Sequence, residues 1–114
     1  MAIQISGTTI INDLKELSSG LASAYDTVTV SATGGTITNR TVYCVTAAGQ
    51  TITLPASPSA GNEVVIINGG NITDTVIARN GQNIMGLAEN MTLDKAYAAM
   101  TFIFTDATRG WRII

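Results

Sequence analysis

The chain has 114 residues, a formal net charge of −2, and only 12% charged residues, where about 25% is typical of a soluble domain. It contains no His and one Cys, so it lacks the commonest general base and metal ligand and cannot form an internal disulfide. This composition predicts one domain without catalytic, cofactor-binding or metal-binding residues, and it gives no electrostatic basis for binding nucleic acid.

Residues 1–24 are predicted to form an extended N-terminal arm with at most one short helix. The opening segment AIQISGTTII alternates apolar and polar residues and is interrupted at Gly7, as in an arm or a first strand. A helix of two turns at most is expected to begin at Asp13, with Glu16 as its capping partner and Gly20 near its end. We expect no signal peptide and no membrane-spanning segment.

Residues 25–114 are expected to form a single β-rich domain, because Thr, Ile and Val are frequent and turn residues recur at short intervals. The fold class predicted is all-β: a small antiparallel β-sandwich or barrel. The segment MTLDKAYAAM is ambiguous, since part of it has helix-forming residues. Strands are expected over Thr27–Ala32, Thr36–Thr38, Thr41–Thr46, Gln50–Leu54, Glu63–Asn68, Asp74–Arg79, Tyr97–Thr105 and Trp111–Ile114.

Three turns stand out in this part of the chain. Pro55, Pro58 and Gly61 predict a stiff corner that joins the runs TITL and EVVIIN into a two-strand unit. The run Asn68–Asn71 is expected to adopt positive φ angles, which Asn and Gly tolerate best, and Asn80-Gly81 is expected to form a turn.

Few residues suggest chemistry. The acidic residues are scattered, mostly in turns, so a catalytic carboxylate pair is a distant alternative. Asp74 with Asp94 or Asp106 is a conceivable calcium site, but no loop has the alternating oxygen ligands of a known motif. Cys44, within the run TVYCV, is interpreted as a buried and inert thiol, although a disulfide between chains stays open.

The low charge indicates that other chains cover much of the surface, because a soluble monomer of this size normally carries more charge. We therefore expect a homo-oligomer. Trp111 is interpreted as a core residue, and the alternative is an interface hot spot or a platform for a sugar. The apolar residues assigned to a candidate assembly interface are Ile3, Ile5, Ile10, Ile11 and Trp111.

The stretches TITLPASPSAGNEVVIIN, TVIARNGQNIMG and MTLDKAYAAMTFIFTDATRGWRII resemble a β-rich module of tailed-phage virion proteins, including those of cyanophages. The elements that carry the resemblance are Leu54-Pro55, Gly61–Asn68, Asn80-Gly81 and Gly110-Trp111, in that order. The opening IQISGTTIIND is similar to the N-terminal segment of many of the same proteins, while residues 22–48 lie outside both matches.

The resemblance implies a non-enzymatic subunit of the virion, made in the host cytoplasm and usually trimeric in fibres. A chain of 114 residues has no room for a long shaft and a receptor-binding tip. We therefore favour a capsid cement or decoration protein that contacts copies of itself and other virion proteins, such as the major capsid or tail protein. The alternative is a short tail-fibre or tail component with lectin-like binding of a host glycan.

Overall fold

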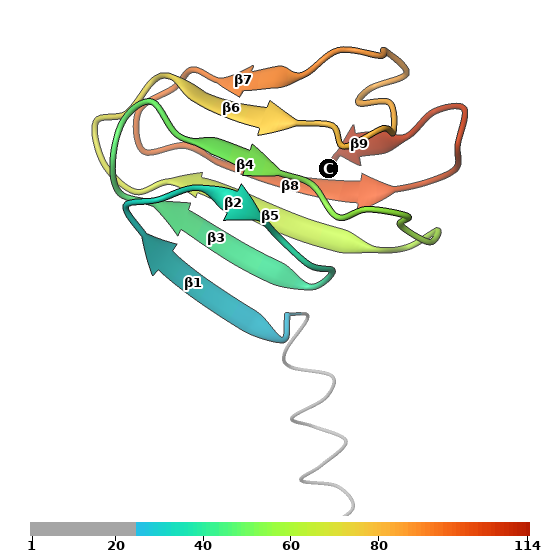
Figure 1. Cartoon of the computed structure of the whole chain (residues 1–114), viewed down its shortest axis with the longest axis horizontal. Coiled ribbons are helices and arrows are strands. Elements are labelled where there is room, and N and C mark those ends of the chain that lie inside the picture. Colours follow the sequence, from blue (N-terminus) through green and yellow to red (C-terminus); the bar gives the residue numbers. More distant parts are fainter. Residues whose placement is uncertain (1–24) are drawn as a thin grey trace, which may run out of the picture.

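The computed structural model describes residues 25–114, which form nine strands and no helix (Figure 1). The predicted arm and short helix lie outside these residues. A five-stranded sheet has the order β1-β3-β5-β8-β9, and a four-stranded sheet has the order β2-β4-β6-β7. The strands are β1 (Thr27–Ser31), β2 (Gly35–Thr36), β3 (Thr41–Val45), β4 (Thr51–Thr53), β5 (Glu63–Asn68), β6 (Thr75–Ala78), β7 (Met91–Leu93), β8 (Ala99–Phe104) and β9 (Trp111–Ile113).

The first six strands alternate between the two sheets. β1, β3 and β5 pair in parallel in one sheet, and β2, β4 and β6 pair in parallel in the other. Each consecutive pair of strands therefore forms one rung of a solenoid-like winding. The last three strands reverse direction and pair antiparallel: β7 with β6, β8 with β5, and β9 with β8.

The prediction of an all-β fold is confirmed for the described residues, but the wholly antiparallel pairing is wrong. The parallel pairs arise because each return to a sheet passes through the other sheet, which supplies the crossover that parallel strands need. The barrel is also wrong, since each sheet is open and has two edge strands. The proline corner joins β4 to β5, which lie in different sheets rather than forming one paired unit.

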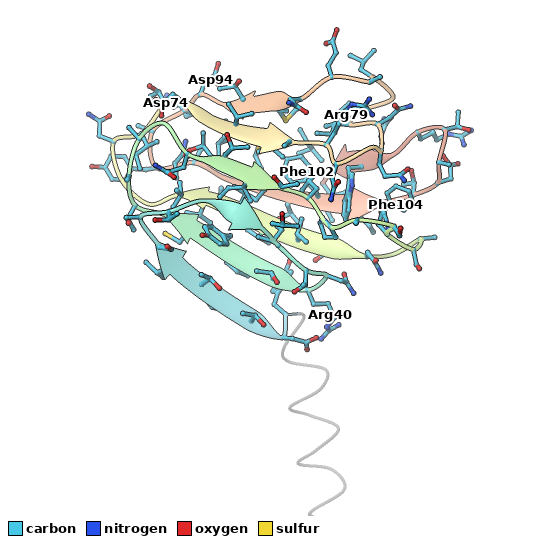
Figure 2. All side chains as sticks on the ribbon, viewed as in Figure 1. Arg40, Asp74, Arg79, Asp94, Phe102 and Phe104 are labelled. Atoms are coloured by element: carbon cyan, nitrogen blue, oxygen red, sulfur yellow. The ribbon has the colours of Figure 1, made fainter. Side chains whose placement is uncertain are left out.

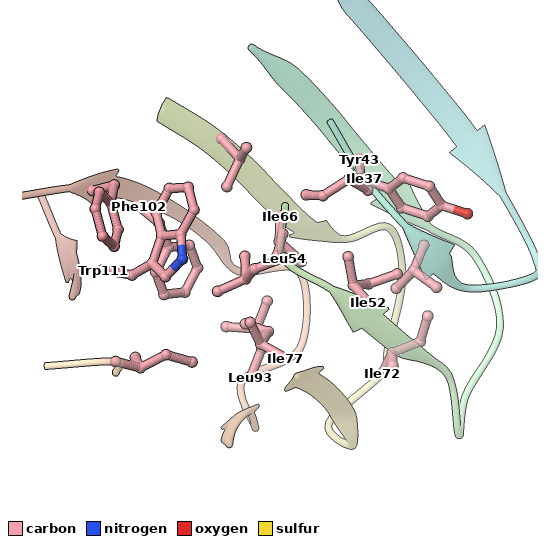
Figure 3. Close-up of a cluster of buried hydrophobic side chains, with 14 residues drawn as sticks. Ile37, Tyr43, Ile52, Leu54, Ile66, Ile72, Ile77, Leu93, Phe102 and Trp111 are labelled. Carbon is pink, nitrogen blue, oxygen red and sulfur yellow. The ribbon is translucent and has the colours of Figure 1, made fainter. Parts of the chain in front are cut away.

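A single buried cluster joins the two sheets (Figure 3). The inward-facing residues alternate with outward-facing ones along each strand, as the burial of β3 shows most clearly. The five-stranded sheet contributes its largest side chains from Phe102 and Trp111, which are completely buried. The four-stranded sheet contributes mainly aliphatic side chains, including Ile52 and Ile77.

Most strands occur where they were expected, and the span Glu63–Asn68 agrees at both ends. β7 was missed, because its three residues lie in the segment that has helix-forming residues. The turn at Asn80-Gly81 is confirmed, with φ angles of 48° and 87°. The run Asn68–Asn71 was misread: none of its residues has a positive φ, and Asn68 is instead the last residue of β5.

Asn68 is a buried hydrogen-bonding centre that ties the end of β5 to three other segments. Its amide nitrogen lies 2.9 Å from the Ile72 carbonyl oxygen and 3.0 Å from those of Leu93 and Lys95. Its amide oxygen accepts a 2.6 Å hydrogen bond from the Thr75 hydroxyl. Because both ends of the amide are satisfied, a polar side chain is stable in this dry position.

Candidate assembly surface

The outer face of the five-stranded sheet, on the side away from the buried cluster, carries two uncharged rows of side chains. Residues that pair across neighbouring strands point to the same face, so the strand register defines these rows. We call them the apolar rows. They are Val28, Val42, Val65 and Thr101 in one row, and Val30, Cys44, Ile67 and Ala99 in the other.

The outer face of the four-stranded sheet differs in composition. Its rows follow in the same way from the register, and they mix threonine with small apolar residues. They are Thr51, Val76 and Thr92, and beside them Thr53 and Ala78. A threonine-rich face can hydrogen-bond to water, whereas the apolar rows contain a single hydroxyl, that of Thr101; Val65 within them is only 9% exposed, and the exposed apolar side chains are those of the β1 edge. The two outer faces are therefore not equivalent, and the apolar one is the candidate assembly surface.

Strand β1 forms an edge of this surface, and it is unusually unprotected. Val28 and Val30 are 70% and 66% exposed. Natural edge strands use charged residues or proline to avoid pairing with other chains. The sequence of this strand, TVTVS, contains neither. Among the described residues, no strand pairs with β1 on the side opposite β3. An open, β-branched edge of this kind is a template for strand addition.

The outer face is polar where β1 and β5 begin, and Tyr25 is held on the sheet there. The Tyr25 hydroxyl donates a 2.6 Å hydrogen bond to the Glu63 carboxylate. This bond raises the pKa of Tyr25, with further contributions from burial and from the negative charge of Glu63, while the Thr101 hydroxyl acts in the opposite direction. Arg40 and Asp26 pair at 3.2 Å, and Figure 2 shows Arg40 near the beginning of β1. The charged groups thus lie at one end of the surface, outside the apolar rows.

Cys44 lies in the second apolar row and is half-buried and free. The interpretation of Cys44 as a buried thiol is wrong, since alternation places Tyr43 and Val45 inside and Cys44 on the outer face. Its sulfur packs beside Gly69, where an added Cβ would lie 2.6 Å from it. Because it is the single cysteine of the chain, it provides a natural position for a label on the outer face.

The residues assigned from sequence to an assembly interface are not brought together among the described residues. Ile3, Ile5, Ile10 and Ile11 lie outside residues 25–114. Trp111 is completely buried and packs edge-on against Phe104, with ring centroids 5.4 Å apart. Its burial agrees with the interpretation as a core residue and leaves it no surface to offer a partner. We therefore remove Trp111 from the candidate surface.

The other candidate sites give little evidence of a function. Within residues 25–114, no group of three or more acidic or Cys side chains is placed to hold a metal ion. Asp74 and Asp94 lie at the end of the molecule away from Arg40 (Figure 2), and Asp74 accepts a hydrogen bond from the Gly49 amide. The described part of the chain also contains no helix long and apolar enough to cross a membrane.

A hollow of about 200 Å³ opens beside β7, lined by Ile84, Met85, Leu87, Glu89, Asn90 and Met91. Its polar groups are one carboxylate and one amide on an exposed loop, which do not define a reaction. Compared with the models of known protein families and with the curated proteins, the chain matches none.

Proposed function

We propose that this protein is a non-enzymatic structural subunit of a tailed-phage virion, and that it acts as a capsid cement or decoration protein. It works through contacts between copies of itself and with the major capsid protein. The identity of the particle rests on the resemblance of the strand and turn elements between Leu54 and Trp111. Assembly as the mode of action rests on the candidate assembly surface.

The observation that carries the proposal is the pair of apolar rows, which end at the open edge of β1. Val28 and Val30 together leave two large aliphatic side chains in water on a strand that can pair further. Burying one such side chain stabilises a contact by about 1.5–3 kcal/mol relative to leaving it exposed. When the same contact is repeated over many copies in a particle, each copy adds its own stabilisation.

In the same proposal, the two sheets are the layers of a sandwich built by winding rather than by hairpins. The buried cluster supports the five-stranded sheet from its inner side, so the core holds the outer face in place. Such a face suits a subunit that lies against a larger surface.

A tail component with lectin-like glycan binding is the second candidate, and Tyr97 favours it. This residue is 72% exposed and has a φ of 62°, an uncommon conformation for a bulky side chain. An exposed aromatic ring held in such a conformation suits a contact with a ligand. The apolar rows, which lie on a sheet face, have no role in that candidate.

The proposal predicts that the purified full chain is a stable homo-oligomer at micromolar concentration, and the resemblance predicts a trimer. The reason is that the apolar rows and the β1 edge are too apolar for a free surface. Sedimentation equilibrium measures the mass directly. A folded monomer with no concentration dependence would contradict self-association.

A further inference from the structure

We propose that two copies of the chain pair through the β1 edge, antiparallel and about a two-fold axis that passes midway between the two Thr29 residues, so that their five-stranded sheets become continuous. This inference rests on the proposed self-association and names its contact. Three properties of β1 support the pairing: its nearly symmetric sequence, the direction of its free backbone amides and carbonyls, and its lack of charge.

The sequence of β1 is nearly symmetric about its centre. In an antiparallel pairing about Thr29, each Val28 faces Val30 of the other copy, and Thr27 faces Ser31. Valines then meet valines on the outer face, and hydroxyl side chains meet hydroxyl side chains on the inner face. Both kinds of cross-strand pair are stabilising.

The backbone amides and carbonyls of β1 point in the directions that this pairing requires. The Thr27 amide donates to the Arg40 carbonyl, and the Ser31 carbonyl accepts from the Thr46 amide, so both residues direct their backbone groups toward β3. In a parallel pair the intervening residues direct theirs the other way. Val28 and Val30 therefore present amides and carbonyls to the open edge, and the two-fold axis at Thr29 places these groups opposite each other.

Within residues 25–114, no like charge opposes the contact. The strand itself is uncharged, and in the paired arrangement Asp26 of one copy lies opposite Ala32 of the other rather than opposite a second carboxylate. Asp26 is moreover paired with Arg40 of its own chain at 3.2 Å. Identical copies can therefore approach without like-charge repulsion at the edge.

The pairing predicts a distance that can be measured on the unaltered chain. In the register, Cys44 lies beside Val30, one strand away from the edge. Neighbouring strands lie about 4.8 Å apart and each residue advances about 3.3 Å, so the two Cys44 Cα atoms should be about 16 Å apart. Because the chain has one cysteine, a nitroxide attached to Cys44 reports this distance without any substitution.

The experiment is pulsed electron–electron double resonance on the spin-labelled full chain, with two variants of Val30. The wild type should give a narrow distribution centred between roughly 15 and 25 Å, which allows for the two label arms. Val30→Pro removes an amide that is directed to the open edge and that no strand of residues 25–114 uses, and proline is tolerated on an edge strand, so the short distance should disappear while the circular dichroism spectrum stays unchanged. Val30→Thr keeps the amide and the β-branched shape and should retain the distance.

The pairing is overturned if the wild type shows no such distance, or if Val30→Pro leaves the distance unchanged. A chain that sediments as an oligomer without the short distance contradicts this contact and leaves the proposed self-association standing. A monomer, including one in which residues 1–24 of the same chain cover the edge, contradicts both. A two-fold contact pairs the copies, so a closed trimer would also contradict this pairing, whereas a three-fold contact added to the pairing would give a hexamer.

Discussion

Replacing Asn68 by aspartate is expected to destabilise the domain at neutral pH by at least about 3 kcal/mol, because it places a negative charge where a hydrogen-bond donor is required. The amide nitrogen of Asn68 lies within 3.0 Å of three backbone carbonyl oxygens. A carboxylate there would face these oxygens in a buried position and could not donate to them, while the Lys95 oxygen would keep only the hydrogen bond from the Ala98 amide. Since a domain is stable by only about 5–15 kcal/mol, chemical denaturation should show a large loss.

The loss should depend on pH in a defined direction. Burial opposite carbonyl oxygens favours the protonated form of the introduced carboxyl, so protonation recovers part of the stability relative to wild type. This recovered stability is fully present below the pKa of aspartate in the unfolded chain, about 3.9. It is lost as the pH rises from there through the higher pKa of the folded state. The control is Asn71→Asp, which makes the same change of charge at an exposed position and should cost little. Equal losses for the two variants would contradict the role of Asn68.

Replacing Gly110 by alanine is expected to destabilise the domain by about 2–4 kcal/mol. Gly110 has a φ of 72°, and an added Cβ would lie 1.9 Å from the Asn83 carbonyl oxygen. The methyl group cannot fit unless the backbone moves. Gly110 precedes Trp111, whose amide donates to that same carbonyl oxygen at 2.8 Å, so the movement would displace the largest side chain of the core.

Gly81→Ala is the matched control for Gly110→Ala. Gly81 also has a positive φ, of 87°, but nothing lies within 4 Å of its added Cβ. It should therefore show only the cost of the left-handed conformation, about 1 kcal/mol. Thermal unfolding of both variants separates the steric contribution from the conformational one. A loss for Gly110→Ala no larger than that for Gly81→Ala would contradict the close approach to Asn83.

The strands of this fold could be predicted from the sequence far better than their partners. A period of two residues identifies a strand such as Glu63–Asn68, yet it does not say which strand lies beside it. The solenoid-like winding also cannot be recognised in the sequence, because the rungs differ in length. Thr27 pairs with Thr41, while Val42 pairs with Val65. A repeat of variable length gives no fixed period for a sequence comparison to detect.

The candidate surface was missed for a related reason. Val28, Val30 and Cys44 belong to predicted strands, but Cys44 was interpreted as buried and Val28 and Val30 were assigned to no surface. The tertiary pairing decides otherwise, since β1 is an edge and Cys44 points outward. The one available signal was the strand TVTVS itself, which lacks the charge or proline that protects an edge. Asn68 was hidden in the same way, because its partners lie on segments distant in sequence.

The most direct test of the proposed function is the location of the protein on purified phage particles. A small epitope tag added after Ile114, whose side chain is 66% exposed, should remain accessible in the assembled particle. Gold-labelled antibody viewed by electron microscopy should then decorate the capsid uniformly, as expected for a cement or decoration protein. Label confined to the tail would support the alternative tail component. Particles without label, from cells in which the tagged protein is produced and folded, would contradict the account of this chain as a virion subunit.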